Sequence, residues 1–276
     1  MELLESISID IAFGDDKFEC PFSHRPEEHN EKNEVPPACS NSSSVLGTSL
    51  KTESSRIETI KLSVPLTLSN GNKRDTVGFS PHHLIPGNEI WKKKKHPLHA
   101  WIQKDVKKKV KGDIGYINNR KHNGVDLPSH HKFSGWSAAK DGDQLAYAIA
   151  AMSADTKQRQ FHDAHKAYSD MVWKSLEKIS TKLDEIVDSK GCGDKNCPGE
   201  KSAPYDPPYE VLPQLKRVAS RLRDKLTGDP AKWQAPVMTS RFGVLYQSGG
   251  KDQEVARQKL SAQRDQMGRP TDNKPV

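Results

Sequence analysis

The sequence lacks a long apolar segment. It contains no run of about 18 apolar residues, so no membrane-spanning helix is predicted. The first residues, Met1-Glu2-Leu3-Leu4-Glu5, do not form a basic region followed by a long apolar one, and no secretory signal is visible. Export by a machine that reads a different signal is compatible with this sequence.

Cysteine and hydrophobic residues are also scarce. The 276 residues include only four cysteines, which is too few for a disulfide framework; they are Cys20, Cys39, Cys192 and Cys197. Cys192 and Cys197 have two interpretations, as half of a structural zinc site or as plain thiols in a loop. Because 33% of the residues are hydrophobic and 29% are charged, we expect one moderate core with long polar segments outside it.

Positive charge is concentrated in one stretch. The chain has 43 Lys and Arg against 36 Asp and Glu, a net charge of +7, and nine of the lysines fall between Trp91 and Lys111. Such a stretch is either a solvated face or a patch that neutralises phosphates and releases counterions. The lysines predicted to bind a polyanionic substrate are Lys92, Lys93, Lys94, Lys95, Lys107, Lys108 and Lys109.

The chain divides by composition into three consecutive parts. Residues 1–74 are predicted to be a leader or connector, residues 75–190 a central domain, and residues 191–276 a linker rich in Cys and Pro, a helix and a polar tail. Within the first part, alternating isoleucines predict a short strand over 7–11, and alternating apolar residues predict a second strand over 59–68. Asn70-Gly71-Asn72 predicts a turn.

The central part predicts further elements. Asn123-Gly124 precedes a short strand that ends at Pro128, and residues 137–152 have a helical pattern. A long helix is expected from Asp155 to Ser189, with one apolar stripe made of Phe161, His165, Tyr168, Val172, Leu176, Ile179, Leu183 and Ile186. Beyond the central part, residues 211–226 predict a second amphipathic helix.

Two adjacent histidines lie among apolar residues, before a Pro-Gly turn signal. In an extended segment the side chains of His82 and His83 point to opposite faces. One imidazole can therefore bind a metal while the other faces a substrate, because neutral imidazole serves both as a metal ligand and as a proton acceptor near neutral pH. His162 and His165, an i,i+3 pair on the long helix, can offer two further nitrogens to the same ion. Such a set leaves coordination positions open, as catalytic sites do.

In this order the motifs resemble a known family. The segments Pro81-His82-His83-Leu84-Ile85-Pro86-Gly87-Asn88, Asn123-Gly124-Val125-Asp126-Leu127-Pro128 and Phe161-His162-Asp163-Ala164-His165 are similar to those of the HNH/endonuclease VII superfamily of ββα-metal nucleases. The resemblance is to its AHH-type bacterial toxin group, with Pro81 where that group has a small residue. It implies an α+β fold with a ββα-metal (His-Me finger) core, mostly helical outside that core.

The resemblance also implies roles for individual residues. His82, His162 and His165 would hold a divalent ion, Mg²⁺ or Zn²⁺. His83 would be the general base, and Asn123 would orient its ring through side chain or backbone. The implied function is a metal-dependent endonuclease acting on DNA; the alternatives are an RNase toxin of the same fold and a non-catalytic zinc-containing nucleic-acid-binding protein.

The surrounding sequence resembles effectors of type VI secretion systems. This implies synthesis in a bacterial cytoplasm, secretion, and action in the cytoplasm of a competitor cell. The implied partners are DNA, a cognate immunity protein, and a secretion apparatus or chaperone contacting the N-terminal region.

The other histidines and the tryptophans have simpler interpretations. His96, His99 and His122 are expected on the phosphate side or the surface, and His130 and His131 are rival metal ligands. Trp91, Trp101 and Trp136 are expected to pack in the core rather than stack on bases.

Overall fold

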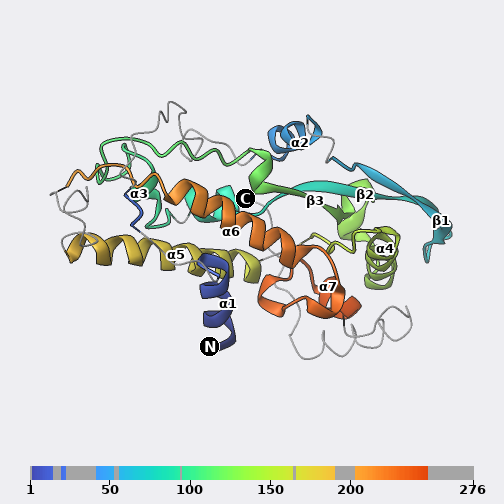
Figure 1. The fold of residues 1–276 in the computed structure, drawn as a ribbon. Coiled ribbons are helices and arrows are strands. Elements are labelled where there is room, and N and C mark those ends of the chain that lie inside the picture. Colours follow the sequence, from blue (N-terminus) through green and yellow to red (C-terminus); the bar gives the residue numbers. More distant parts are fainter. Residues whose placement is uncertain are drawn as a thin grey trace. The chain divides into compact units, whose positions relative to one another are not determined.

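The structure is a computed structural model of the 276-residue chain. It describes residues 2–14, 20–22, 42–52, 56–93, 95–163, 166–189 and 203–247 (Figure 1). The predicted site residues Lys94 and His165 lie outside the described residues, as do Cys39, Cys192 and Cys197. Among the helices of the described ranges, none is both long and apolar enough to cross a membrane.

Helices and a small sheet make up the regular structure, and the α+β class is confirmed. The sheet has the strand order β1-β2-β3. The elements in chain order are α1 (Glu2–Ala12), α2 (Ser43–Lys51), β1 (Thr59–Thr67), β2 (Lys73–His83), α3 (His99–Ile102), β3 (Gly124–Ser129), α4 (Asp141–Ala154), α5 (Lys166–Asp188), α6 (Val211–Leu226) and α7 (Arg241–Gln247).

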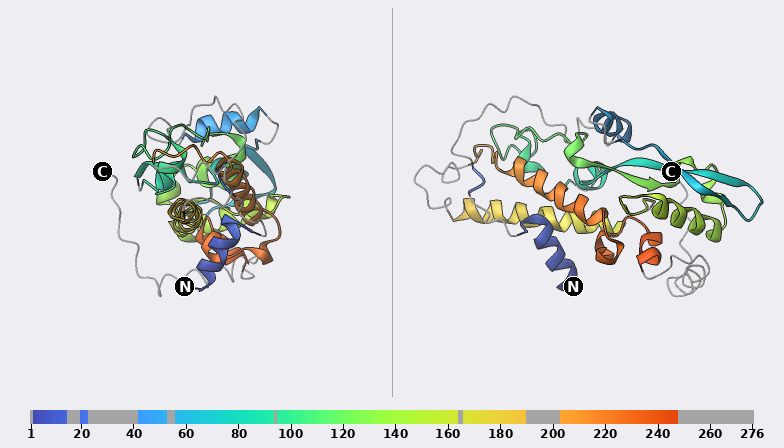
Figure 2. Two further views of the ribbon diagram at one scale, coloured as in Figure 1. Left: turned by 60° about the vertical axis from the view of Figure 1, so that its left-hand side comes forward. Right: turned by 45° about the vertical axis from the view of Figure 1, so that its right-hand side comes forward.

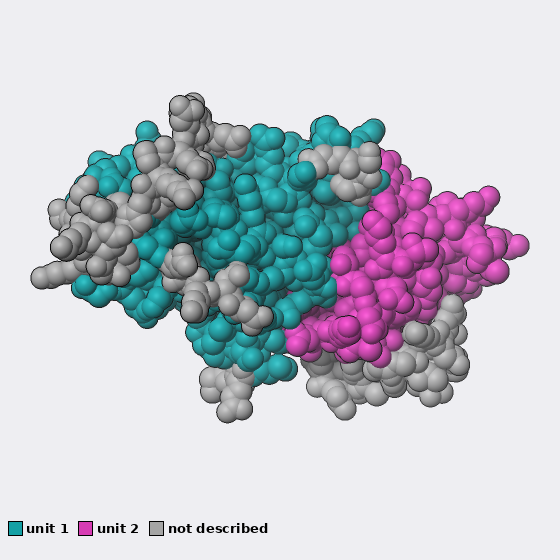
Figure 3. All heavy atoms as spheres, viewed as in Figure 1, with its two compact units in different colours: residues 1–56, 81–126, 166–225 teal, residues 57–80, 127–165, 226–276 magenta. Residues whose placement is uncertain are grey.

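The chain forms two compact units, which Figure 3 shows in different colours. Unit 1 contains residues 1–56, 81–126 and 166–225, and unit 2 contains residues 57–80, 127–165 and 226–276. Each unit is therefore assembled from three separate pieces of chain, whereas the composition of the sequence divides it into three consecutive parts.

Unit 2 contains the hairpin of β1 and β2. These strands are antiparallel, and their register shifts between Lys61 and Leu66, around Pro65. Proline cannot donate a hydrogen bond to a neighbouring strand, so an irregularity is expected there. The predicted turn is confirmed: the Leu68 N–H donates to the Asn72 carbonyl over 2.8 Å, and Gly71 has a φ of +84°.

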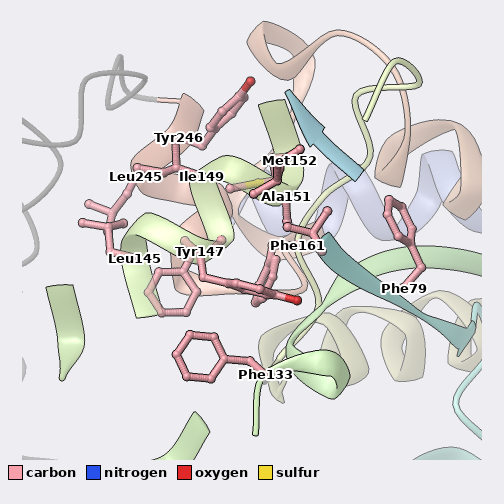
Figure 4. Close-up of a cluster of buried hydrophobic side chains, with 14 of the residues drawn as sticks. Phe79, Phe133, Leu145, Tyr147, Ile149, Ala151, Met152, Phe161, Leu245 and Tyr246 are labelled. Atoms are coloured by element: carbon pink, nitrogen blue, oxygen red, sulfur yellow. The ribbon is translucent and has the colours of Figure 1, made fainter. Parts of the chain in front are cut away.

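The hydrophobic core of unit 2 is rich in aromatic rings. Figure 4 shows Phe79 from β2, Tyr147 from α4 and Phe161 among its members. Helix α4 packs against β1, and the right-hand view of Figure 2 shows the two elements next to each other. The Tyr147 hydroxyl accepts a hydrogen bond from the Gly78 N–H over 2.9 Å, so this core also fixes a backbone group of β2.

The predicted start of the long helix at Asp155 is wrong. The Asp155 carboxylate accepts from the N–H groups of Lys157 and Arg159 and forms a two-bond pair with the Arg159 guanidinium at 2.7 Å. These bonds resemble a helix cap, but Gln158 has a φ of +51° and the chain continues without a helix. Helix α5 begins only at Lys166, and its predicted apolar stripe is confirmed from Tyr168 onward.

In unit 1 the predicted strand at residues 7–11 is wrong, because this segment is helix α1, which packs against α5 (Figures 1 and 2). Ile7 and Ile11 are buried while Ile9 is 45% exposed. The i,i+4 pair Ile7 and Ile11 falls on one helix face, so three alternating isoleucines also fit a helix. Helix α6 covers the predicted residues 211–226.

His96 and His99 are buried, so their predicted placement on the surface is wrong. The Leu98 N–H donates to His96 Nδ1, and His96 Nε2 donates to the Trp173 carbonyl, both over 3.0 Å. His99 Nε2 bonds the Gln103 side chain over 2.7 Å. Trp91 and Trp101 are buried, which confirms their predicted place in a core.

The buried His96 predicts a pH-dependent stability. Burial lowers its pKa from 6.5 to about 4, so the unfolded chain binds this proton more readily than the folded chain. Stability from His96 is therefore present above pH 6.5 and is lost as the pH falls toward 4. We expect His96 alone to lower the free energy of unfolding by about 2 kcal/mol between pH 7 and pH 5.

Denaturant unfolding of the wild type and of His96→Gln at both pH values measures this contribution. The variant should lose about 2 kcal/mol less than the wild type on acidification. An equal loss in both proteins would contradict the assignment.

Candidate active site

Strand β2 ends at the adjacent histidines. His82 is 3% exposed and His83 is 6% exposed, and the two rings have different neighbours, as expected for consecutive residues of a strand. The ring of His82 lies edge-on to the ring of Tyr168 from α5, with centroids 5.2 Å apart. The ring of His83 contacts Asn119 instead, in the segment before β3.

Asn123 holds the backbone that follows the histidines. Its carbonyl accepts from the Leu84 N–H over 2.9 Å, and its Oδ1 accepts from the Ile85 N–H over 2.7 Å. Its Nδ2 donates to the carbonyls of Ile85 and Asn118 and to the Asn118 Oδ1, over 3.0–3.1 Å. One fully buried side chain therefore ties the end of β2 to the segment that leads into β3.

Tyr168, from helix α5, holds the same backbone segment after His83. Its hydroxyl donates to the Leu84 carbonyl over 2.6 Å. Tyr168 is fully buried, and burial raises the pKa of its hydroxyl well above the usual value, so this group stays a neutral donor. Both backbone groups of Leu84, the residue after His83, are thus occupied by hydrogen bonds.

The ring of His83 is oriented by Asn119. The distance from His83 Nε2 to Asn119 Oδ1 is 2.8 Å, and the Ser42 N–H also donates to this Oδ1, over 3.3 Å. A backbone N–H can only donate, so the shared atom must be the amide oxygen. His83 Nε2 therefore carries a proton, and Nδ1 of the neutral ring carries the lone pair.

His83 is suited to accept a proton. Burial lowers the pKa of His83, and the hydrogen bond to Asn119 opposes this effect in part. The imidazole is therefore neutral at neutral pH, with Nε2 donating to Asn119 and Nδ1 available as a base.

The predicted histidine pair before α5 does not form an i,i+3 pair on a helix. His162 lies in an extended segment of unit 2, where its N–H donates to the Pro128 carbonyl over 2.7 Å and it forms a parallel bridge with Ser129. His165 lies outside the described residues. Among the residues that the structure does describe, no three His, Cys, Asp or Glu side chains are placed to hold a metal ion.

The predicted substrate-binding lysines differ in their surroundings. Lys109 pairs with Asp184 at 2.5 Å and lies 3.9 Å above the Trp101 ring, so it holds helix α5 against the segment that carries α3. Lys93 pairs with Glu89 on the surface. Lys92, Lys95, Lys107 and Lys108 are exposed.

Sequence reasoning missed Asn119 and Ser42. We expected Asn123 to orient the His83 ring, whereas the structure bonds that ring to Asn119 and the backbone of the following residues to Asn123. The signal in the sequence was the pair Asn118-Asn119, in the segment that precedes the Asn-Gly turn. No local pattern connects Ser42 with this segment.

Comparison with known proteins supports a nuclease. Residues 66–192 match the model of AHH, a nuclease family of the HNH/ENDO VII superfamily with a conserved AHH motif. The matched region contains His82, His83, Asn119 and Asn123. No curated protein and no solved structure matches the chain.

The two asparagines are expected to differ when each is replaced by alanine. Asn119→Ala should lower kcat for nucleic-acid cleavage by ~10–100-fold with KM nearly unchanged, because the ring of His83 loses its orientation. Asn123→Ala should instead lower the free energy of unfolding by about 2–4 kcal/mol, because four buried hydrogen-bonding groups lose their partner.

Steady-state cleavage and denaturant unfolding of both variants separate the two roles. The Nε2 proton of His83, observed by ¹⁵N NMR, should exchange faster with solvent in Asn119→Ala. A purely destabilising effect in Asn119→Ala, with kcat unchanged, would contradict its orienting role.

Proposed function

We propose that this protein is a metal-dependent endonuclease that hydrolyses phosphodiester bonds of DNA. The family match over residues 66–192 supports the reaction class. The observation that carries the assignment of the base is the hydrogen bond from His83 Nε2 to Asn119 Oδ1, because it leaves the lone pair on Nδ1.

In the proposed reaction His83 Nδ1 takes a proton from water. The resulting hydroxide attacks phosphorus, and the bond from phosphorus to the leaving sugar oxygen breaks with its electron pair on that oxygen, which then takes a proton from solvent water. Asn119 accepts from Nε2 throughout, so the ring needs no change of tautomer before it accepts the proton. The charged imidazolium formed in this step keeps Asn119 as its partner.

Nucleases of this superfamily are generally metal-dependent, and we propose His82 as one ligand. It supplies a buried imidazole on the face opposite to His83. His162 and His165 are the further ligands that the resemblance implies. A bound divalent ion, Mg²⁺ or Zn²⁺, would supply stabilisation of the negative charge on the phosphate and the leaving oxygen.

The proposed substrate is DNA, and RNA is the alternative within the same reaction class. The exposed lysines Lys92, Lys95, Lys107 and Lys108 favour a polyanion of either kind, because counterion release does not depend on the sugar. Parallel assays with supercoiled plasmid and with RNA of matched length decide between the two.

We further propose that the nuclease is an antibacterial toxin. The resemblance to type VI effectors supports delivery from the producing cell into the cytoplasm of a competitor. An immunity protein would protect the producer, and residues 1–74 would contact a chaperone or the secretion apparatus. Expression of the full chain in bacteria tests the toxicity.

His83→Ala should strongly reduce cleavage. We expect the rate of plasmid cleavage with added Mg²⁺ to fall by ~10²–10⁴-fold, because the variant lacks the proposed base that takes the proton from water. Growth of bacteria that express this variant should equal growth of the uninduced culture, whereas the wild type should stop growth.

Lys61→Ala, an exposed change in β1, is the control and should leave cleavage and toxicity unchanged. Wild-type cleavage by a folded His83→Ala protein would remove His83 as the base. If the wild type holds a tightly bound zinc ion and binds DNA but does not cleave it, the non-catalytic zinc protein is favoured instead.

His82→Ala should weaken metal binding. We expect the affinity for Mn²⁺ or Zn²⁺ in calorimetric titrations to fall by at least ~10-fold, because one imidazole ligand is lost. His83→Ala should bind the ion as the wild type does. Equal affinities in the wild type and His82→Ala would show that His82 is not a ligand.

A further inference from the structure

Unit 1 contains a pocket of about 230 Å³ beside the segment that holds His83. Its walls come from helix α2 and the residue after it, the segment before β3, and helix α6. The polar side chains that line it are Ser49, Thr52, Arg120, Lys121, His122 and Lys216.

The pocket is positively charged. Three of its lining residues are permanent cations at neutral pH, and none of the described residues that line it is Asp or Glu. Arg120 and Lys216 are exposed and form no ion pair with any residue that the structure describes. Hydroxyls from Ser49 and Thr52 add neutral hydrogen-bonding groups, so the lining is suited to an anion with several acceptor oxygens.

The pKa of His122 is sensitive to the positive charge in this pocket. Burial, followed by the charges of Lys216, Arg223, Arg120 and Lys121 in that order, lowers its pKa to about 4. Its Nε2 is buried and has no hydrogen-bond partner among the described residues. A buried ring nitrogen thus lies beside these cations without a partner in the described part of the chain.

The pocket and the candidate active site share one hydrogen-bonded segment. Arg223 from α6 donates to the carbonyls of Lys121, His122 and Gly124 over 3.1–3.2 Å, and the Lys121 N–H donates to Ser49 Oγ over 3.0 Å. Arg120 directly follows Asn119, the residue that orients the His83 ring. The cations of the pocket therefore stand on the same segment of chain as the residue that orients His83.

We propose that this pocket binds a non-scissile phosphate of the nucleic-acid strand that is cut at His83. The inference rests on the proposed nuclease function. The volume is smaller than the ~300–1,000 Å³ of most small-molecule sites, which suits a phosphate group and its sugar better than a whole nucleobase ligand. Because the pocket shares a segment with the active site, we favour the substrate of that site as the ligand of the pocket. An acidic protein would not need a binding pocket next to His83.

Binding of a fluorescein-labelled DNA duplex to the full chain, in EDTA so that no cleavage occurs, tests the proposal. Arg120→Ala/Lys216→Ala should weaken binding by ~10-fold at moderate salt and reduce the slope of log K against log salt by about one. Lys61→Ala/Lys73→Ala, which removes the same charge from the exposed β1–β2 hairpin, should have a much smaller effect.

NMR of the His122 ring gives an independent readout. Because a phosphate beside an imidazole favours its charged form, the pKa of His122 should rise from about 4 when the duplex binds. In the Arg120→Ala/Lys216→Ala protein the duplex should move this pKa less.

The outcomes distinguish the pocket from the reaction. If both double variants weaken duplex binding equally and the wild type cleaves normally, the phosphate site in the pocket is overturned and the nuclease function stands. If duplex binding depends on Arg120 and Lys216 but the wild type does not cleave DNA when Mg²⁺ is added, the phosphate site is supported and the proposed hydrolysis is overturned. A polyglutamate peptide whose affinity alone falls in Arg120→Ala/Lys216→Ala would point to an acidic protein and overturn the proposal.

Discussion

The hydrogen bonds of Asn123 are the constraint on which the site depends. They bind the backbone of Leu84 and Ile85 to the segment of Asn118, and so fix the end of β2 against the approach to β3. His83 and Asn119 stand on the two sides of this connection. The 2.8 Å hydrogen bond between them requires that the backbone of β2 and the backbone of the segment before β3 are both fixed in position. A buried side chain can reach only the partners that the fold places beside it.

The surroundings of each buried histidine decide its chemistry. His83 and His96 both have lowered pKa values because burial disfavours the charged ring. His96 uses both nitrogens in bonds to backbone groups, so protonation of its ring would break the bond from Leu98. The hydrogen bond that the His83 ring forms with the described part of the chain uses Nε2. Nδ1 of the His83 ring can therefore receive a proton without loss of an existing bond.

Segments outside the family match contribute to the site. The match begins at residue 66 and ends at residue 192. Ser42, just before α2, holds the Asn119 oxygen, and Arg223 of α6 holds three carbonyls around His122. The candidate site and the segment beside it are thus held by residues on both sides of the matched region. Both flanks belong to the same compact unit as the histidines.

Elements with a strong local pattern could be predicted from the sequence. Helix α6, strand β1, the turn at Gly71 and the apolar face of α5 from Tyr168 onward follow from the spacing of apolar residues and from turn residues. The His82-His83 pair and Asn123 were found in the same way, as motifs at a recognisable spacing. Their residue types and order alone carried the expectation of a nuclease.

The remaining features were decided by tertiary structure, since their causes lie far along the chain. Ser42 is 77 residues from Asn119 and Arg223 is 102 residues from Lys121, so no local pattern contains these bonds. Three alternating isoleucines fit a strand or a helix until packing against α5 selects α1. The burial of His96 and the charge around His122 likewise depend on neighbours that only folding supplies, and desolvation then sets which rings stay neutral.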